Sequence, residues 1–351
     1  MAENAATHPP RVTVVVIPRE RFSRTEVSLD SLYHHTTEPF HLIYVDGHSP
    51  PPIRGYLERQ AREKGFRLIR LPHFVPTSQA RNIGFRQVNT PYVVFVENDV
   101  LLRPGWLEAL IRCAEETGAR VVSPLYLEHR YERETVHMAG GVAHLETVNG
   151  RRRCIERHRF QGQTLAEVSH LLRREPTELI EFHCLVLRTE LLRAMGGFDE
   201  GMKNTSEHVD FCLAMKEAEI PVYFEPASVV VYVQPPPFAW YDFRFYCTRW
   251  NAAWARQTVA YFASKWGLDP DDPFLSAREH WTTARRREIF TTLLNRVCPF
   301  SRVRHWLTVL LDFCTTRTIA RPAASTLKTV VASDRRLTET TADSSRPVRS
   351  A

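Results

Sequence analysis

Two carboxylates follow an apolar run with one residue between them, a spacing that can hold a metal ion. Residues 93–96 read VVFV, and Glu97, Asn98 and Asp99 come directly after them. A turning backbone just past a strand can direct the side chains at i and i+2 toward one cation. Mn²⁺ and Mg²⁺ prefer oxygen ligands and commonly take one or two carboxylates together with substrate phosphates. The spacing predicts a site for one of these ions, and the alternative for the tripeptide alone is a solvated turn.

Three further polar residues are candidates for binding a nucleotide. Asp46 ends the apolar run LIYV, where its carboxylate can accept hydrogen bonds from a base or a ribose hydroxyl. The structural alternative is an Asx turn opened by Asp46 and Gly47. Arg81 and Asn82, in the segment ARNIGF, could place a guanidinium near a phosphate or could lie on the surface.

The segment SEHVD contains candidates for a general base. Glu207 and Asp210 lie three residues apart in the first turn of an expected helix, with Ser206 as its N-cap, and therefore share a face. His208 lies between them and is a further proton acceptor. The alternative is that acids in a first turn only complement the helix dipole. All three residues remain candidates for the base.

The elements that position these residues alternate along the first part of the chain. Apolar runs typical of buried strands are separated by segments with helical spacing, which indicates an open, mostly parallel α/β sheet. Ligands of such sheets bind beyond the carboxyl ends of the strands, where Asp46, Glu97 and Asp99 are expected. The expected strands are 12–17, 40–45, 66–71, 92–96 and 120–125, and the expected helices are 23–35, 53–65, 77–88 and 104–118.

The pattern changes after residue 130. Residues 130–160 are polar and basic, which predicts a hairpin or long loop over one face of the sheet. Another strand, a helix and a Gly-Gly turn are expected within 181–202, followed by the helix that begins after Ser206. Aromatic residues at 246, 250, 254, 262 and 266 have mostly four-residue spacing, which favours core packing over a sugar-stacking face.

Composition narrows the class of protein. The chain has 351 residues and a net charge of +6, which suggests an anionic partner such as nucleotide phosphates, acidic lipid or nucleic acid. The absence of GxGxxG, P-loop and GxSxG sequences argues against a dinucleotide-binding domain, a P-loop NTPase and an α/β hydrolase. Seven scattered cysteines without a CxxC pair, no visible signal peptide and no long apolar run predict a cytoplasmic protein.

Several of these motifs occur together in an order that resembles the family 2 glycosyltransferases of the GT-A fold. The resemblance spans roughly residues 11–266. The motifs that carry it are VTVVVIP, LIYVDGHS, ARNIGF, FVENDVLLRPGWLEAL, GGFDEGM and SEHVDFCLAMKEAEIPVYFEPASVVVY.

The resemblance implies an inverting transfer of a sugar from a nucleotide-sugar donor to a hydroxyl acceptor. By the family pattern, Asp46 holds the nucleoside, while Glu97, Asn98 and Asp99 stand at the DxD motif. Glu97 then faces the ribose and Asp99 binds the metal. Glu207 and His208 stand at the Glu-Asp motif that supplies the catalytic base.

Three positions depart from that pattern. Glu97 replaces the first Asp of DxD, and His208 replaces the Asp of the Glu-Asp pair. Some relatives have a metal-binding His after the strand that follows this helix, and the segment VVVYVQ has none. The replacement at His208 supports an alternative function, a catalytically degenerate GT-A domain that binds nucleotide sugars without turnover.

The expected organisation is a flexible tail (1–10), a GT-A glycosyltransferase domain (11–268), a basic helical extension (269–330) and a disordered tail (331–351). Residues 269–273, DPDDP, are the expected linker. An amphipathic pattern in 276–315 predicts peripheral docking on the acidic inner face of a membrane, or alternatively packing against the main domain or a second subunit. We expect a metal-dependent, hexosyltransferase-like enzyme of cell-surface polysaccharide or glycoconjugate synthesis. Its acceptor is expected to be a glycan, a lipid-linked sugar or another hydroxyl compound. No nucleic-acid partner is expected, and a homo-oligomer is left open.

Overall fold

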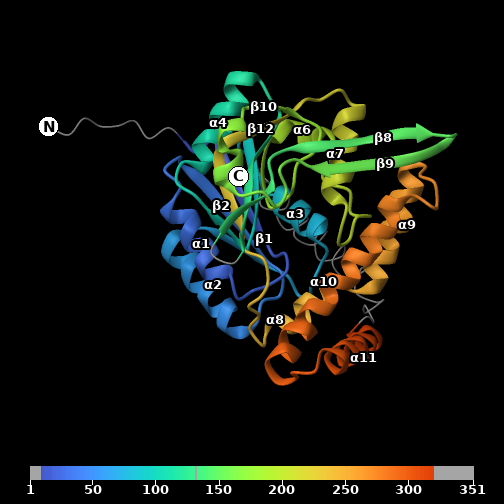
Figure 1. Cartoon of the computed structure of the whole chain (residues 1–351). Coiled ribbons are helices and arrows are strands. Elements are labelled where there is room, and N and C mark those ends of the chain that lie inside the picture. Colours follow the sequence, from blue (N-terminus) through green and yellow to red (C-terminus); the bar gives the residue numbers. More distant parts are fainter. Residues whose placement is uncertain (1–8, 131–132, 320–351) are drawn as a thin grey trace, which may run out of the picture.

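A mixed sheet forms the centre of the molecule, and helices pack around it (Figure 1). The computed structural model describes residues 9–130 and 133–319. Within these residues the sheet order is β10-β12-β6-β11-β4-β1-β2-β3, with β5 pairing with β12 and β7 pairing with β6. The predicted fold class, a mostly parallel open sheet flanked by helices and followed by C-terminal helices, is confirmed. Most of the predicted tails, residues 1–8 and 331–351, lie outside the described residues.

The boundaries of the elements agree with the sequence pattern to within a few residues in the first part of the chain. The strands are β1 (Val12–Ile17), β2 (Phe40–Asp46), β3 (Arg67–Arg70), β4 (Tyr92–Glu97), β5 (Val100–Leu102), β6 (Val121–Arg130), β7 (Arg133–Met138), β8 (Gly141–Val148), β9 (Arg151–His158), β10 (Glu175–Thr177), β11 (Cys184–Arg188) and β12 (Val222–Tyr232). The helices are α1 (Thr25–His34), α2 (Pro51–Lys64), α3 (Thr77–Phe85), α4 (Trp106–Thr117), α5 (Leu165–Val168), α6 (Thr189–Ala194), α7 (Glu207–Glu217), α8 (Asp242–Arg249), α9 (Ala252–Trp266), α10 (Pro273–Val297) and α11 (Ser301–Ile319), and a 3₁₀ turn covers Ser169–Leu171.

The parallel strands β3, β2, β1 and β4 bring their carboxyl ends to one edge of the sheet. All six residues of β1 are buried, as expected for a strand covered on both faces. Next to β4 lies β11, which runs antiparallel and pairs Cys184 with Val96. The residue before β11 therefore lies beside the residue that follows Val96, and this register brings His183 to Glu97.

Helix α3 lies unusually close to the sheet, because it has a glycine where it crosses β1 and β2. A Cβ at Gly84 would be 2.4 Å from Val15 Cγ1 and 3.1 Å from Val45 Cγ2. Only a residue without a side chain fits there. The close approach carries Arg81, one turn earlier, to the end of β4.

The segment after residue 130 is more regular than the alternative of a long loop. The strand β7 pairs with β6, and β8 and β9 form a two-stranded hairpin that projects from the main body (Figure 1). Ser206 precedes α7 but does not cap it, which corrects the sequence prediction. Its backbone has φ 62°, and its side chain makes no capping hydrogen bond.

The aromatic series in α8 and α9 packs into the core, as predicted. Tyr246, Trp250, Phe262 and Trp266 are buried. The expected linker is tied to the domain, because Asp272 caps α10 and accepts a 2.8 Å hydrogen bond from the amide of Cys154 in β9.

The C-terminal helices bury only part of the apolar side that the amphipathic pattern in 276–315 indicates. Ile289 and Phe290 of α10 are buried against Tyr246 and Trp250. Farther along α10, Leu293 and Val297 are exposed. The helix α10 therefore packs on the domain as far as Phe290, and its last turns do not.

Candidate active site

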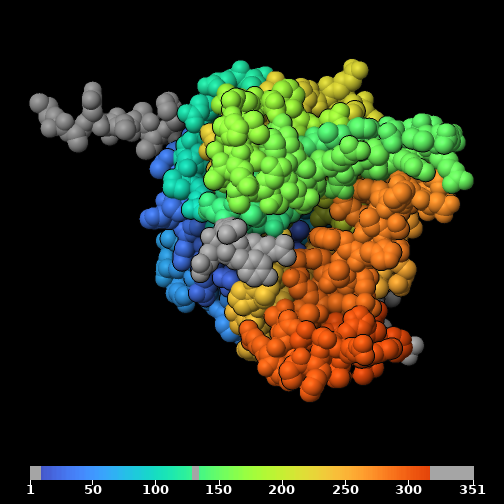
Figure 2. Space-filling model, in the orientation of Figure 1, coloured from blue at the N-terminus to red at the C-terminus, as the bar shows by residue number. Residues whose placement is uncertain are grey.

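A cavity of about 870 Å³ opens where the carboxyl ends of the strands meet the β8–β9 hairpin, α7 and α10. Figure 2 shows the green hairpin lying above the orange helices on this face of the molecule. The cavity is lined by charged side chains from segments that are far apart in the sequence. They include Arg19, Glu97, Glu181, Glu207, His208, Arg249 and Arg285.

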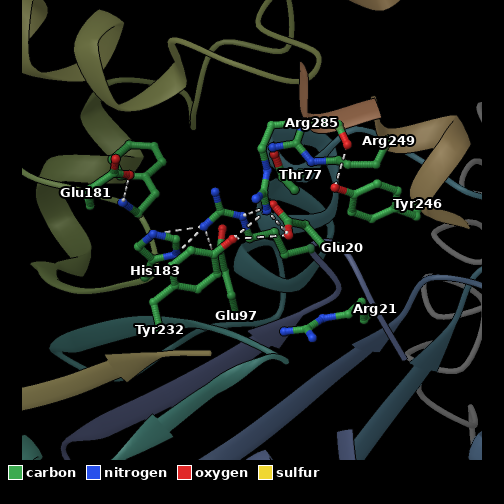
Figure 3. A network of polar contacts seen from close by, with 12 residues as sticks. Glu20, Arg21, Thr77, Glu97, Glu181, His183, Tyr232, Tyr246, Arg249 and Arg285 are labelled. Carbon is green, nitrogen blue, oxygen red and sulfur yellow. Dashed lines mark hydrogen bonds and ion pairs between the residues drawn. The ribbon is translucent and has the colours of Figure 1, made fainter. Parts of the chain in front are cut away.

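Glu97 lies at the inner end of the cavity and is fully engaged. Its carboxylate accepts hydrogen bonds from Arg19 Nη1 at 2.8 Å and Arg81 Nη2 at 2.7 Å. It also lies 2.8 Å from His183 Nδ1 (Figure 3). Burial alone would raise the pKa of Glu97, but Arg19, His183 and Arg81 hold it well below its usual range. The group is therefore a fixed negative charge between two guanidinium groups.

Arg81 and Asn82 turn toward the protein rather than toward the cavity. Arg81 is fully buried and also donates to the carbonyl of Phe182 at 3.2 Å. Asn82 donates to the carbonyl of Phe198 at 2.8 Å and accepts from the amide of the same residue. In this structure Arg81 positions Glu97, and Asn82 holds the turn after α6 against α3; neither lies on the surface.

Asn98 and Asp99 differ in their side-chain hydrogen bonds. Asn98 accepts from the amide of Arg19 at 3.0 Å and donates to the carbonyl of Arg21 at 2.8 Å, so it shapes the chain after β1. Both carboxylate oxygens of Asp99 are buried without a hydrogen-bond partner among the described residues. Burial, together with nearby Glu20, raises the pKa of Asp99 to about 7. An orphaned carboxylate of this kind fits the ligand of a cation.

Asp46 ends β2 as predicted and is 1% exposed. Its Oδ1 accepts from the amide of Ser49 at 2.8 Å, and Arg70 contacts its Oδ2. Asp46 is thus the predicted strand-end carboxylate, but its side chain bonds the amide three residues on and not the i+2 amide of the alternative Asx turn. Asp46 does not line the main cavity.

The three candidates for the base do not all face the same space, although one helix carries them. Glu207 lines the cavity, accepts from Thr77 Oγ1 at 3.1 Å and Arg249 Nη2 at 3.3 Å, and leaves Oε2 without a hydrogen-bond partner in the described chain. His208 also lines the cavity. Asp210 instead accepts hydrogen bonds from Trp266 Nε1 and Lys265 Nζ, both at 2.9 Å, and lies outside it.

The chain after β1 supplies functional residues that the sequence analysis did not single out. Arg19, Glu20 and Arg21 follow Pro18, the first residue after β1, and are buried. Glu20 accepts from Arg285 Nη2 at 2.8 Å and Tyr232 Oη at 3.1 Å (Figure 3). The signal was present, because three consecutive charged residues begin two positions after a buried strand, close to the strand-end positions of Asp46 and Glu97.

Several groups of known proteins are similar to this chain in sequence. Residues 13–178 match the family model described as glycosyl transferase family 2. The pre-mycofactocin glycosyltransferase of Mycobacterium tuberculosis is 27% identical over 221 residues, which cover 63% of this chain and 42% of that protein. The O-antigen biosynthesis protein RfbC of Myxococcus xanthus is 26% identical over 216 residues, which cover 59% and 16%. The chain spans less than half the length of these curated relatives.

Two solved structures are similar over most of the chain. A mannosyltransferase from Pyrobaculum calidifontis in complex with GDP-Man and Mn²⁺ has a TM-score of 0.49 and 16% identity, with coverage of 90% of this chain and 85% of that one. TarS of S. aureus in complex with UDP has a TM-score of 0.46 and 16% identity, with coverage of 88% and 90%.

Proposed function

Because residues 13–178 match the model of glycosyl transferase family 2, we propose that this chain is a member that moves a sugar from a nucleotide-sugar donor to a hydroxyl acceptor with inversion at the anomeric carbon. The observation that carries the proposal is Glu207, which lines a cavity at the carboxyl ends of the strands and whose buried Oε2 has no hydrogen-bond partner among the described residues. A carboxylate in that position can accept the proton of an acceptor hydroxyl as it attacks.

The electrostatics of Glu207 suit a base that starts ionised. Burial would raise its pKa, but Arg249, Arg81 and His208 lower it. Glu207 is therefore deprotonated at neutral pH. His208 is the second candidate, and Asp210, which bonds to α9 and does not line this cavity, is the third.

Guanidinium groups in the cavity would receive the diphosphate of the donor. Arg19, Arg249 and Arg285 all line the cavity, and each is at most 11% exposed as a side chain. Guanidinium groups match phosphate oxygens in a planar, bidentate geometry, and they are stronger partners when water is excluded. Asp46, fixed by Ser49 and Arg70, is the proposed ligand of the nucleoside.

A divalent ion, Mn²⁺ or Mg²⁺, is the proposed cofactor, and Asp99 is the residue that would hold it. Its two orphaned oxygens fit this role, whereas Glu97 is already occupied by Arg19, Arg81 and His183. When bound, such an ion neutralises charge on a departing diphosphate.

Turnover at saturating donor tests the proposal. We expect Glu207→Gln to lose at least about 100-fold in kcat, because general-base catalysis contributes 10²–10⁴-fold. Asp210→Asn should stay within a few-fold of wild type. Glu217→Gln, on the exposed end of the same helix, is the matched control. Near-normal turnover of both Glu207→Gln and His208→Ala would show that the base does not lie in residues 207–210.

The alternative function, a binding module without turnover, makes a different prediction in the same experiment. A module would bind UDP-, GDP-, dTDP- or CMP-sugars in a thermal-shift screen without releasing nucleoside diphosphate when acceptors are added. A ligand at about 100 times its Kd adds roughly 2.7 kcal/mol to stability, which such a screen detects. Release that depends on acceptor would exclude the module.

We further propose that α11 brings the active site to a lipid-linked or surface acceptor by docking on an anionic membrane. Within the described part of the chain, none of the helices combines the length and apolarity that crossing a bilayer requires. The helix α11 instead has its polar side inward: Thr308 and Asp312 are buried, and Asp312 pairs with Arg286 and Arg287 of α10.

The outward side of α11 and the preceding turn is apolar and basic. Trp306 is 73% exposed, Phe300 is 70% exposed and Leu310 is 56% exposed. Arg296 and Arg302 are exposed beside them. Apolar side chains can insert at the headgroup level of a bilayer, and each basic residue adds about 1 kcal/mol near an anionic surface.

Co-sedimentation with anionic and zwitterionic vesicles tests this docking surface. The full chain should pellet only with anionic vesicles and be released by salt, and Leu310→Asp should weaken binding. Leu171→Asp, at a 50% exposed leucine outside these helices, is the matched control. Binding that is equal in both variants, or no binding by wild type, would contradict the proposal.

A further inference from the structure

One wall of the cavity gathers side chains of the kinds that bind transition metals. His137 comes from β7, Glu156 and His158 from β9, Glu181 from the chain before β11, and His208 from the first turn of α7. Two separate sets in this wall, His137 with Glu181 and His183, and Glu156 with His158 and His208, each have ligand atoms within 4.8 Å of one another. The two sets meet where Glu181 Oε1 lies 3.6 Å from His208 Nε2. The transfer mechanism above uses only His208, as an alternative base.

We propose that His137, Glu181, His208 and Glu156 hold a divalent first-row transition metal, with zinc as the best-fitting ion, at a site separate from Asp99. Glu181 Oε1 lies 3.7 Å from His137 Nε2 and 3.6 Å from His208 Nε2, and Glu156 Oε1 lies 3.2 Å from His208 Nε2. Ligands at about 2.0–2.2 Å from a tetrahedral ion are roughly 3.3–3.6 Å apart, close to these separations.

The orientation of His137 supports a ligand role. Its Nδ1 lies 2.5 Å from Glu128 Oε1, which fixes the proton on that nitrogen. Its Nε2 is buried without a hydrogen-bond partner in the described chain and is directed at Glu181. A carboxylate that holds the far nitrogen of a histidine is the usual outer partner of a metal-bound imidazole.

The second carboxylate, Glu156, keeps one oxygen directed at the histidines. Arg278 contacts Oε2 of Glu156 and leaves Oε1 facing His158 and His208.

Nearby groups define the limits of the site. His183 is held by Arg19 and Glu97, so it is not one of the proposed ligands. Asp99 does not line this cavity. Imidazole with carboxylate suits zinc, iron, copper and nickel better than Mg²⁺, whose preferred ligands are oxygen alone.

With four protein ligands, the ion could take a hydroxyl from the cavity only as a fifth ligand. A zinc ion in such a site lowers the pKa of a bound water or hydroxyl. An acceptor hydroxyl bound there would lose its proton more readily to the neighbouring base. This use of the metal rests on the proposed transfer reaction, whereas the metal site does not, so the two can fail separately.

Metal titration of the full chain tests the site without an activity assay. Protein treated with a chelator is titrated with Zn²⁺ against a chromophoric competitor, and with Co²⁺ while the visible spectrum is recorded. Wild type should bind one equivalent of Zn²⁺, and Co²⁺ should give the intense bands of four-coordinate geometry. His137→Asn and His208→Asn should lose this binding, and Glu128→Gln should weaken it about 10–100-fold.

Two further variants locate the ion. His144→Asn changes a histidine of β8 that bonds Glu178 and does not line the cavity, and Asp99→Asn changes the other proposed metal residue. Both should bind Zn²⁺ like wild type. The proposal is overturned if wild type binds no Zn²⁺, if His137→Asn and His208→Asn bind normally, or if Asp99→Asn abolishes binding. Should the two histidine variants fail to fold, as judged by circular dichroism, Glu128→Gln decides the question.

Discussion

Glu97 illustrates at the scale of one residue how the site is stabilised. It has two guanidinium groups and an imidazole around one carboxylate that is 2% exposed. Removing one member of a buried pair leaves an uncompensated charge, which costs far more than the net value of the pair. The site is therefore built on charges that must all be present.

We predict that Glu97→Gln lowers the free energy of unfolding by about 3–5 kcal/mol, because Arg19 and Arg81 lose their partner. Urea denaturation measures the change. Glu58→Gln is the control, since its i,i+4 pair with Arg54 is about half exposed and should contribute less than about 1 kcal/mol. A change at Glu97 no larger than the change at Glu58 would show that the guanidinium groups find other partners.

The sequence could place single residues at strand ends but not identify their partners. Asp46, Glu97 and Asp99 were placed correctly because strand ends follow from local apolar runs. The partner His183 depends on the insertion of β11 beside β4, and Arg285 reaches Glu20 across 265 residues of sequence. No local pattern contains that information.

At the scale of elements, the contact of α3 with the sheet depends on one missing side chain. Gly84→Ala should lower the free energy of unfolding by about 1–3 kcal/mol, because the new Cβ would overlap Val15. Gly55→Ala in α2 is the matched control: a Cβ there meets nothing within 4 Å, so alanine should stabilise the helix by about 0.5–1 kcal/mol. Thermal unfolding of the two variants should shift in opposite directions. Two shifts of the same sign would contradict the close packing of α3.

Element types were more predictable than their packing. Helical spacing and β-branched runs correctly indicated β1 to β4 and α1 to α4. The same pattern did not reveal that α11 buries Asp312 and exposes Trp306, because an amphipathic stripe shows which residues are alike but not which side faces the protein. The prediction that Ser206 caps α7 was wrong for a related reason. Serine is a preferred N-cap residue, but the turn that precedes α7 holds Ser206 at φ 62°, and its side chain makes no capping hydrogen bond.

At the scale of the whole molecule, the C-terminal helices are part of the folded body. Tyr246 and Trp250 share one buried cluster with Ile289 and Phe290 of α10. We predict that ending the chain at residue 268 exposes this cluster and yields protein that aggregates or melts at least several degrees lower. Ending it at residue 299 keeps the cluster and should cost less. Size-exclusion chromatography and thermal melts compare the two, and a chain of 268 residues that melts like wild type would show an independent domain.

The contact between the β8–β9 hairpin and α10 bears on kinetics. Glu156 of β9 contacts Arg278 of α10, and both residues line the same cavity as Glu97 and Arg19. A molecule bound near the mouth would block the path of one that must reach the inner end. We therefore expect compulsory-order kinetics, in which donor binds first and nucleoside diphosphate leaves last. Product inhibition by nucleoside diphosphate should then be competitive against donor and noncompetitive against acceptor, and competitive inhibition against both would indicate random order.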